Sequence, residues 1–366
     1  MMKTSLPFTA LALGLATVFC APANAADVSL SGNLDAGFVL GHAKDHNGSG
    51  TSFKFADGLV NENHIALKAV ETINNDLAVG FNLVSTFHLN NGALEQGIDE
   101  DEGEDGQQHA THPLFAHEAR LFIRNSYGEL ALGRFGALGS DQGSYNVVIP
   151  NMDPLAGPGF QHGLLKTPVL NNAVALKTAT FGGFTGYAQY SFGVDNQDAA
   201  KHDENHRHAG VAATYETERA TLVASVERML AGHIAGWDSA SSTIVNIGGN
   251  LDFEAVKLFA GFQSARHVST EMNKINLRGG ADTIRTGTIG ATKTFGADDV
   301  AASVFHSRIK TGSNKKETAC GGGLRLTHHL SPRTSLYVGG DVARYKEDDG
   351  RKLTKARAYT GLSHRF

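Results

Sequence analysis

The sequence has few cysteines, few prolines and no long hydrophobic run beyond its first 25 residues. Its 366 residues include two cysteines and eight prolines. No later stretch reaches the ~18–20 apolar residues that a membrane-spanning helix needs, which excludes a polytopic helical membrane protein. With so little proline, the 43 glycines are not collagen-like and indicate tight turns and closely spaced strands. The formal net charge of -5 argues against a nucleic-acid partner.

The first 25 residues have the pattern of an export signal. Lys3 precedes an apolar run from residue 6 to residue 20, and Ala23-Asn24-Ala25 is typical of a small-residue cleavage site. We expect a cleaved signal peptide at residues 1–25. A lipid-bearing Cys20 is disfavoured because the preceding Phe19 is bulky. The exported chain then keeps only Cys320, so it has no internal disulfide framework, and Cys320 is best interpreted as a small strand residue.

Hydrophobic and polar residues alternate along most of the remaining chain. Leu30, Leu34, Phe38 and Leu40 share one parity, whereas Ser29 and Asn33 share the other. This period of two predicts strands with one apolar and one polar face. The segments predicted in this way number sixteen: 27–41, 61–72, 75–88, 115–126, 129–136, 170–181, 183–193, 207–216, 220–230, 243–252, 255–266, 285–295, 298–309, 317–329, 333–346 and 352–366.

The connections between these segments alternate between short turns and long polar loops. Short periplasmic turns and long external loops are typical of outer-membrane barrels. In lipid, a sheet must close because every backbone N–H and C=O needs a partner within the protein. Residues 26–366 are therefore predicted to form one all-β domain, a 16-stranded antiparallel transmembrane β-barrel. A secreted β-sandwich is the alternative; the even strand count, the turn–loop asymmetry and the terminal Phe366 weigh against it.

Six motifs, in order along the chain, carry a resemblance to a known family. They are VSLSGNLDAG at 28–37, IALKAVE at 65–71, SYGELALGR at 126–134, FGGFTGYAQYSF at 181–192, LSPRTSLY at 330–337 and GLSHRF at 361–366. Together they resemble the Gram-negative general porins, which are trimeric 16-stranded diffusion channels. The resemblance implies an outer-membrane homotrimer, in contact with membrane lipid and lipopolysaccharide, that passes ions and small hydrophilic solutes.

The resemblance also implies an inward-folded constriction loop after the fifth strand, here roughly residues 136–169. Asp141 and Asp153 are its acidic members, and the family sets such acids against basic residues on the facing wall. Arg134 matches a basic position at the loop entrance. On a continuing strand, Arg134 would share the outward parity of the apolar Leu130 and Leu132 and place a charge in lipid, at a cost of ~2–4 kcal/mol. We therefore expect the strand to end near Gly133 and Arg134 to turn inward.

Where the family usually has an inward arginine, this chain has His64, and His117 stands where an arginine is common. Lys68 shares the parity of His64, and Lys166 is a further candidate basic residue of the constriction. Histidine titrates near pH 6.5, whereas arginine stays charged. The substitution suggests a pore that is less positive at neutral pH than its relatives and shifts toward anions in acid.

Two loop clusters are weaker candidates for other functions. Seven acids lie between Glu95 and Asp105, which suits either a solvated loop or a hard cation such as Ca²⁺. His202, His206 and His208 lie close together in another loop, where they are weak candidate ligands for Zn²⁺. We expect no cofactor and no catalytic residue. A substrate-specific channel, and an adhesive or metal-capturing barrel, remain alternatives to the diffusion channel.

Overall fold

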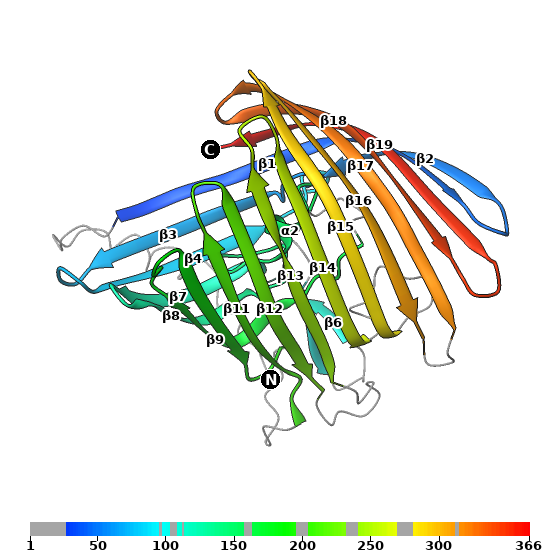
Figure 1. The fold of residues 1–366 in the computed structure, drawn as a ribbon. Helices are drawn as coiled ribbons and strands as arrows, with labels where there is room; N and C mark the ends of the chain where they lie inside the picture. The colour runs from blue at the N-terminus through cyan, green and yellow to red at the C-terminus, as the bar shows by residue number, and fades with distance from the viewer. Residues whose placement is uncertain are drawn as a thin grey trace, which may run out of the picture.

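The computed structural model describes residues 27–94, 97–102, 108–111, 113–156, 163–194, 204–231, 241–268, 281–311 and 315–366. Almost all of these residues lie in antiparallel strands that wrap around a central lumen (Figure 1). The described strands are β1 (Asp27–Lys44), β2 (Ser49–Asp57), β3 (His64–Thr72), β4 (Ala78–Thr86), β5 (Gly97–Glu102), β6 (Gln108–Thr111), β7 (Glu118–Asn125), β8 (Gly128–Gly136), β9 (Val169–Thr178), β10 (Phe184–Ser191), β11 (Arg207–Glu216), β12 (Ala220–Leu230), β13 (Ser242–Asp252), β14 (Lys257–Val268), β15 (Ala281–Phe295), β16 (Asp298–Lys310), β17 (Lys316–Ser331), β18 (Thr334–Lys346) and β19 (Lys352–Arg365).

The sheet closes on itself. The first strand, β1, pairs antiparallel with the last, β19, from Asn33–Arg365 to Lys44–Thr354. The backbones of Gly32 and Phe366 exchange two N–H···O bonds of 3.1 Å at this seam. Closure joins the first strand of the wall to the last, as a barrel in lipid requires.

The wall has sixteen strand positions, because β2 and β3 are two parts of one position. Along β1, residues 36–44 pair with β2 and residues 27–33 pair with β3. The chain leaves the wall between these two parts, at residues 58–63. The predicted 16-stranded antiparallel barrel is therefore confirmed.

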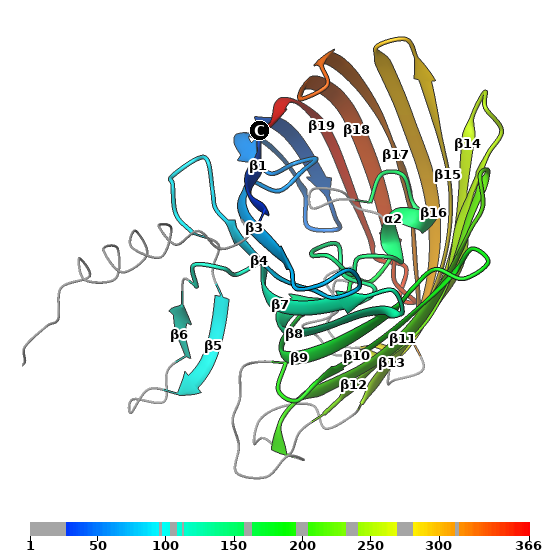
Figure 2. The same ribbon diagram turned by 90° about the vertical axis from the view of Figure 1, so that its left-hand side faces the viewer.

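The described strands include two features that were not predicted from the sequence. One is β2, since the second predicted segment begins only at residue 61. The other is the two-stranded sheet of β5 and β6, which lies within the predicted external loop and stands apart from the wall (Figure 2).

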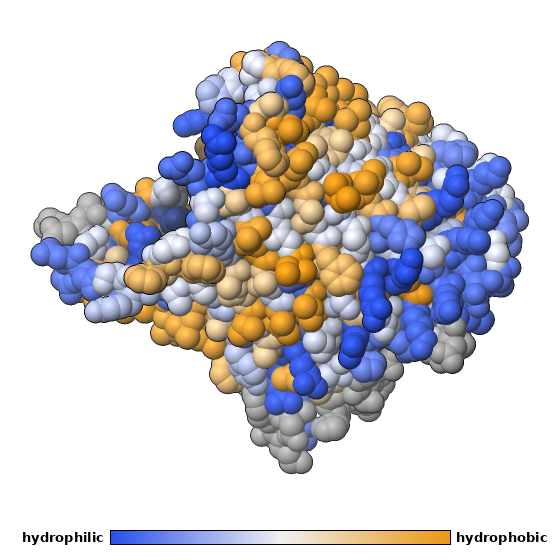
Figure 3. Space-filling view, viewed as in Figure 1, coloured by the Kyte–Doolittle hydropathy of each residue, from blue (hydrophilic) through white to orange (hydrophobic). Residues whose placement is uncertain are grey.

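The two faces of the wall differ as the alternation predicts. Large apolar side chains point outward and stay exposed, for example Leu30 and Phe38 on β1. Inward positions include many polar side chains, such as Asn33 and Asp35 on the same strand. The outward apolar residues gather into a band across the surface, with hydrophilic residues beyond it (Figure 3).

The only described helix is the four-residue α2 (Ile149–Met152), which lies inside the barrel within the long β8–β9 connection (Figure 2). None of the described helical segments has the length and apolarity to cross a membrane.

Candidate functional site: a constriction formed by two inward segments

The β8–β9 connection folds back into the lumen and packs against one side of the wall. Its buried apolar residues form a core with inward residues of β7 to β12; the connection contributes Ala137, Leu138, Tyr145, Val148, Ile149, Met152 and Leu164. The inward-folded constriction loop expected from the resemblance is therefore present. We call residues 137–168 the constriction loop.

Inward glycines on the wall create the space for this loop. A Cβ atom at Gly248 or Gly261 would lie 2.7 or 2.6 Å from side-chain atoms of Met152, and one at Gly290 would lie 2.5 Å from Pro154. Real Cβ atoms are not found so close to a neighbour. The glycines of β13, β14 and β15 therefore let α2 lie directly on the sheet.

Wall side chains bind the loop backbone on the same side. Gln263 of β14 donates from Nε2 to the Leu165 carbonyl (2.9 Å) and accepts the Leu165 N–H (2.7 Å). Thr286 of β15 donates to the Gly163 carbonyl (2.8 Å). These bonds satisfy buried backbone groups that loop residues inside a barrel would otherwise leave unpaired.

The start of the loop is fixed by a buried charged cluster on β7 and β8. Arg120 contacts Glu118 (2.6 Å) and Glu129 (2.6 Å), and the Tyr145 hydroxyl donates to Glu129 (2.9 Å). The Arg120 guanidinium also lies over the Phe122 ring, 4.6 Å from its centroid. Burial raises the pKa of the Tyr145 phenol, which therefore stays protonated and remains a donor.

A second segment, residues 58–63, also enters the lumen; we call it the short lobe. Asp35 of β1 holds it, because its carboxylate accepts the backbone N–H groups of Leu59 (3.1 Å) and Asn61 (3.3 Å). Asp35 also accepts the Tyr337 hydroxyl (2.7 Å). Leu59 packs in a small apolar cluster with Val39, Tyr337 and Tyr359.

The short lobe meets the constriction loop at Glu62. One carboxylate oxygen accepts the Gln142 side-chain amide (2.6 Å), and the other lies 2.9 Å from His117 Nδ1. His117 Nε2 accepts the Gly143 N–H (3.0 Å). The two inward segments are therefore joined through one acid and one histidine.

The structure places four of the predicted constriction residues in two different settings. Asp141 and Lys166 form an ion pair with each other within the constriction loop, rather than facing each other from opposite walls. His64 and Lys68 lie together on the inward face of β3, opposite Thr86 and Asn82 of β4. His64 Nδ1 is 3.0 Å from the Glu62 carbonyl, and its ring centroid lies 6.3 Å from that of His117.

Asp153 is buried rather than directed at water. It is 1% exposed, and its carboxylate accepts the Thr288 hydroxyl (3.0 Å) and the Leu155 N–H (2.9 Å). Its contacts anchor the loop to β15. Thr288 lies 135 positions from Asp153 along the chain, so no local sequence pattern could have predicted this contact.

The expectation that β8 ends near Gly133 is wrong, since the strand continues to Gly136. Arg134 pairs with Ala119, whose neighbours Glu118 and Arg120 point inward, so Arg134 keeps the outward parity of Leu132. Its guanidinium donates to the Ala116 carbonyl (2.6 Å) and to Asn171. These two acceptors bind the guanidinium at the strand end, so the side chain does not make the inward turn that we expected.

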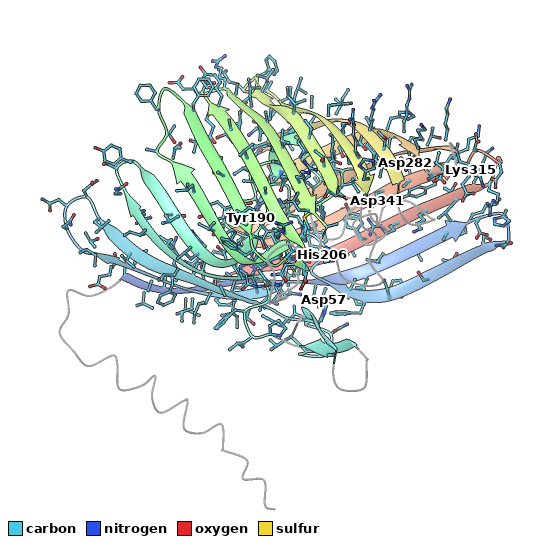
Figure 4. The ribbon with its side chains drawn as sticks, turned by 90° about the horizontal axis from the view of Figure 1, so that it is seen from below. Asp57, Tyr190, His206, Asp282, Lys315 and Asp341 are labelled. Carbon is cyan, nitrogen blue, oxygen red and sulfur yellow. The ribbon has the colours of Figure 1, made fainter. Side chains whose placement is uncertain are left out.

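Basic residues of the last strands face the lumen and were not singled out from the sequence. They are Arg325 on β17 and Lys355 and Arg357 on β19, each at an inward register position. Arg357 forms a bidentate pair with Asp341 of β18, at 3.0 and 2.7 Å. Asp341 is labelled in Figure 4. Strand parity was the available signal, since Arg357 shares the parity of the inward Ser363.

The structure describes only part of the predicted His-rich loop, namely the part that includes His206 and His208. His202 lies outside the described residues. His208 is buried on the inward face of β11 with its Nε2 3.2 Å from Glu227, and His206 is buried just before that strand. Within the described residues, no group of three or more His, Cys, Asp or Glu side chains could hold a metal ion. The acids from Glu95 to Asp105 lie in a segment whose side chains are not described.

Comparison with known proteins identifies the family of the chain. A family model described as "Gram-negative porin" matches residues 9–350 of the chain. The chain belongs to the Gram-negative porin family. This porin has no match among curated protein sequences.

Solved structures share the fold of this porin. An anion-selective porin from Comamonas acidovorans is 18% identical, with a TM-score of 0.62 over 93% of this chain and 100% of that one. The outer membrane channel DcaP of Acinetobacter baumannii is 10% identical, with a TM-score of 0.64 over 94% and 98%. OmpT of Vibrio cholerae is 12% identical, with a TM-score of 0.61 over 94% and 99%.

Proposed function

We propose that this outer-membrane porin is a passive diffusion channel for ions and small hydrophilic solutes. The observation that carries the proposal is the placement of the constriction loop. A barrel of sixteen strands encloses a lumen too wide for wall side chains to fill. The described loop residues pack onto the β7–β15 side, with α2 against β12 to β15, and narrow the lumen from that side.

The charges proposed to tune permeation come from both inward segments and from the facing wall. Glu62 and Asp141 are the acids. His64 and Lys68, with the Lys166 that pairs with Asp141, and Arg325, Lys355 and Arg357 are the basic groups. Such charges act on ions in a confined aqueous path and set which ion is enriched. The proposal includes no cofactor and no step in which a substrate is turned over.

Assembly and export complete the proposal. We infer a homotrimer, supported by the β5–β6 sheet that projects from the wall and by an OmpT structure whose title names a trimer form. Residues 1–25 serve as the export signal, and residues 26–366 form the single barrel domain.

Liposome swelling tests the proposal. Purified protein in liposomes is diluted into solutions of neutral sugars of increasing size. A diffusion channel predicts rates that fall smoothly with solute size and do not saturate with concentration. Saturation by one solute would contradict free diffusion and indicate a substrate-specific channel. No swelling with folded, inserted protein would contradict a channel altogether and favour adhesion or capture by the loops.

A further inference from the structure

Part of the constriction loop is held by polar contacts rather than by packing. Residues 141–144, which we call the loop tip, are half-buried or exposed, whereas residues 137–140 before them and Tyr145 after them are buried. None of the four tip residues belongs to the apolar core that holds the neighbouring parts of the loop. A change in one polar contact can therefore move the tip while the rest of the loop stays packed.

Each residue of the loop tip has a polar partner on a different segment. The partners, in order from residue 141 to residue 144, are Lys166, Glu62, His117 and Glu118. Lys166 belongs to the loop itself. The other three lie in the short lobe, directly before β7 and on β7. These contacts hold the tip against the side of the wall formed by β3, β4 and β7.

The contact with His117 differs from the others because it requires a neutral ring. His117 Nε2 accepts the Gly143 N–H at 3.0 Å, so this nitrogen carries no proton. The proton of the neutral ring is then on Nδ1, which lies 2.9 Å from a carboxylate oxygen of Glu62. A second proton would enter at Nε2 and would place one N–H group against another. The protonated ring therefore keeps Glu62 as an acceptor but can no longer accept from Gly143.

Three titratable groups are described around this contact. Glu62 of the short lobe offers a charged ring an anionic partner at 2.9 Å. His64 of β3 faces His117 with its ring centroid at 6.3 Å, so it repels a charged His117 only when it is itself protonated. Glu118 of β7 reaches the tip through Ser144 but is already paired with Arg120. The arrangement thus supplies a charged His117 with a partner, and that partner is not on the loop tip.

We propose that His117 is a positioning residue whose protonation releases the loop tip and narrows the pore in acid. This inference rests on the proposed diffusion channel. Since the partners of the tip lie on the wall side, a released tip moves away from the wall and toward the lumen. Loss of the hydrogen bond to Gly143 shifts the ratio of held to released tip roughly fivefold. A moved tip obstructs uncharged solutes as well as ions, which a change of pore charge alone does not.

Liposome swelling with a small and a large neutral sugar tests the proposal. Rates are compared at about pH 7.5 and about pH 5, where histidine gains a proton and most carboxylates stay ionised. In the wild type, the rate for the large sugar relative to the small one should fall in acid, by up to about fivefold. His117→Gln keeps a donor and an acceptor without titrating and should lose this response. His88→Gln is the matched control and should retain it, because His88 lies at the other end of the same external connection, 3.5 Å from Asp57.

A cross-linked variant examines the movement itself. The side chains of Glu62 and Gln142 are in contact at 2.6 Å, so cysteines at these two positions can be joined by a short thiol-reactive linker in a Cys320→Ser background. The linked tip cannot leave the short lobe, and the relative rate for the large sugar should be equal at both pH values. Cleavage of the linker should restore the response. Folding of every variant is checked by heat-modifiable electrophoretic mobility.

An acid response that persists in His117→Gln or in the linked protein would overturn the proposal. Equal relative rates at both pH values in the wild type would overturn it as well. Loss of the response in His64→Gln, with His117 intact, would also overturn it and would assign the effect to His64. Absence of swelling at both pH values would instead contradict the diffusion channel, so failure of the channel is distinguished from failure of the switch.

Discussion

The two inward segments narrow the same lumen but are held in different ways. The constriction loop has a buried apolar core, packs against inward glycines of β13–β15 and forms hydrogen bonds to several strands. The short lobe is held by the Asp35 carboxylate, by a small cluster around Leu59 and by the contacts of Glu62 with Gln142 and His117. The difference indicates that packing along its length holds the loop, whereas a few polar contacts hold the lobe, and Asp35 makes several of them.

The largest effect is expected for Asp35→Ala. This change leaves the Leu59 and Asn61 N–H groups and the Tyr337 hydroxyl without their shared acceptor, at a cost of ~3–5 kcal/mol in the free energy of unfolding. Urea unfolding of the refolded barrel in detergent measures it. Asp35→Asn, which keeps one acceptor oxygen, should be intermediate. An unfolding midpoint equal to that of the wild type would show that the lobe is held by other contacts.

The inward glycines that make room for the loop on β13–β15 give the next prediction. Gly261→Leu places a side chain into Met152 and should displace α2, which costs ~1–3 kcal/mol by overpacking and raises single-channel conductance. Gly287→Leu on the outer face of the neighbouring strand is the control and should leave conductance unchanged. Equal conductance of the two variants would contradict the claim that the inward glycines position α2.

The junction of the two segments predicts a change in ion preference. Glu62→Gln keeps the shape of the side chain and removes one negative charge from the constriction. A single charge near a hydrated ion contributes about 1 kcal/mol in water, so the anion-to-cation permeability ratio should rise up to about fivefold. Reversal potentials in a KCl gradient measure the ratio. A ratio that does not move would remove Glu62 from the set of selectivity charges.

The smallest effect is expected from pH. Protonation of His64 in acid adds a positive charge to the constriction, so selectivity should shift toward anions as pH falls. His64→Arg should abolish most of this shift, and His117→Gln reports the separate contribution of the neighbouring histidine. An unchanged pH response in His64→Arg would contradict the hypothesis.

The sequence predicts the wall well because each strand carries its own signal. Alternation at period two placed all sixteen strand positions, and the parity of β1 assigned Asn33 inward and Leu34 outward as the structure has them. The same rule alone keeps Arg134 outward; the expected inward turn came from the cost of a charge in lipid, which was given more weight than the local pattern. Parity was also sufficient to find Arg357.

The constriction was predicted only in outline because its contacts join distant parts of the chain. Asp153 depends on Thr288, and Glu62 depends on Gln142. The short lobe has no alternation and was therefore assigned partly to a loop and partly to a strand. The break between β2 and β3 follows from Asp35, whose bonds to the lobe have no counterpart in the pattern of β1 alone.

The central claim is a water-filled barrel narrowed, but not closed, by its inward segments. Single-channel conductance of refolded protein in a planar bilayer under a KCl gradient tests it most directly. Large ohmic steps that close in threes are predicted, with a reversal potential that shifts in Glu62→Gln. Absence of steps from protein shown to be folded and inserted would contradict the claim, because the lumen would then be plugged.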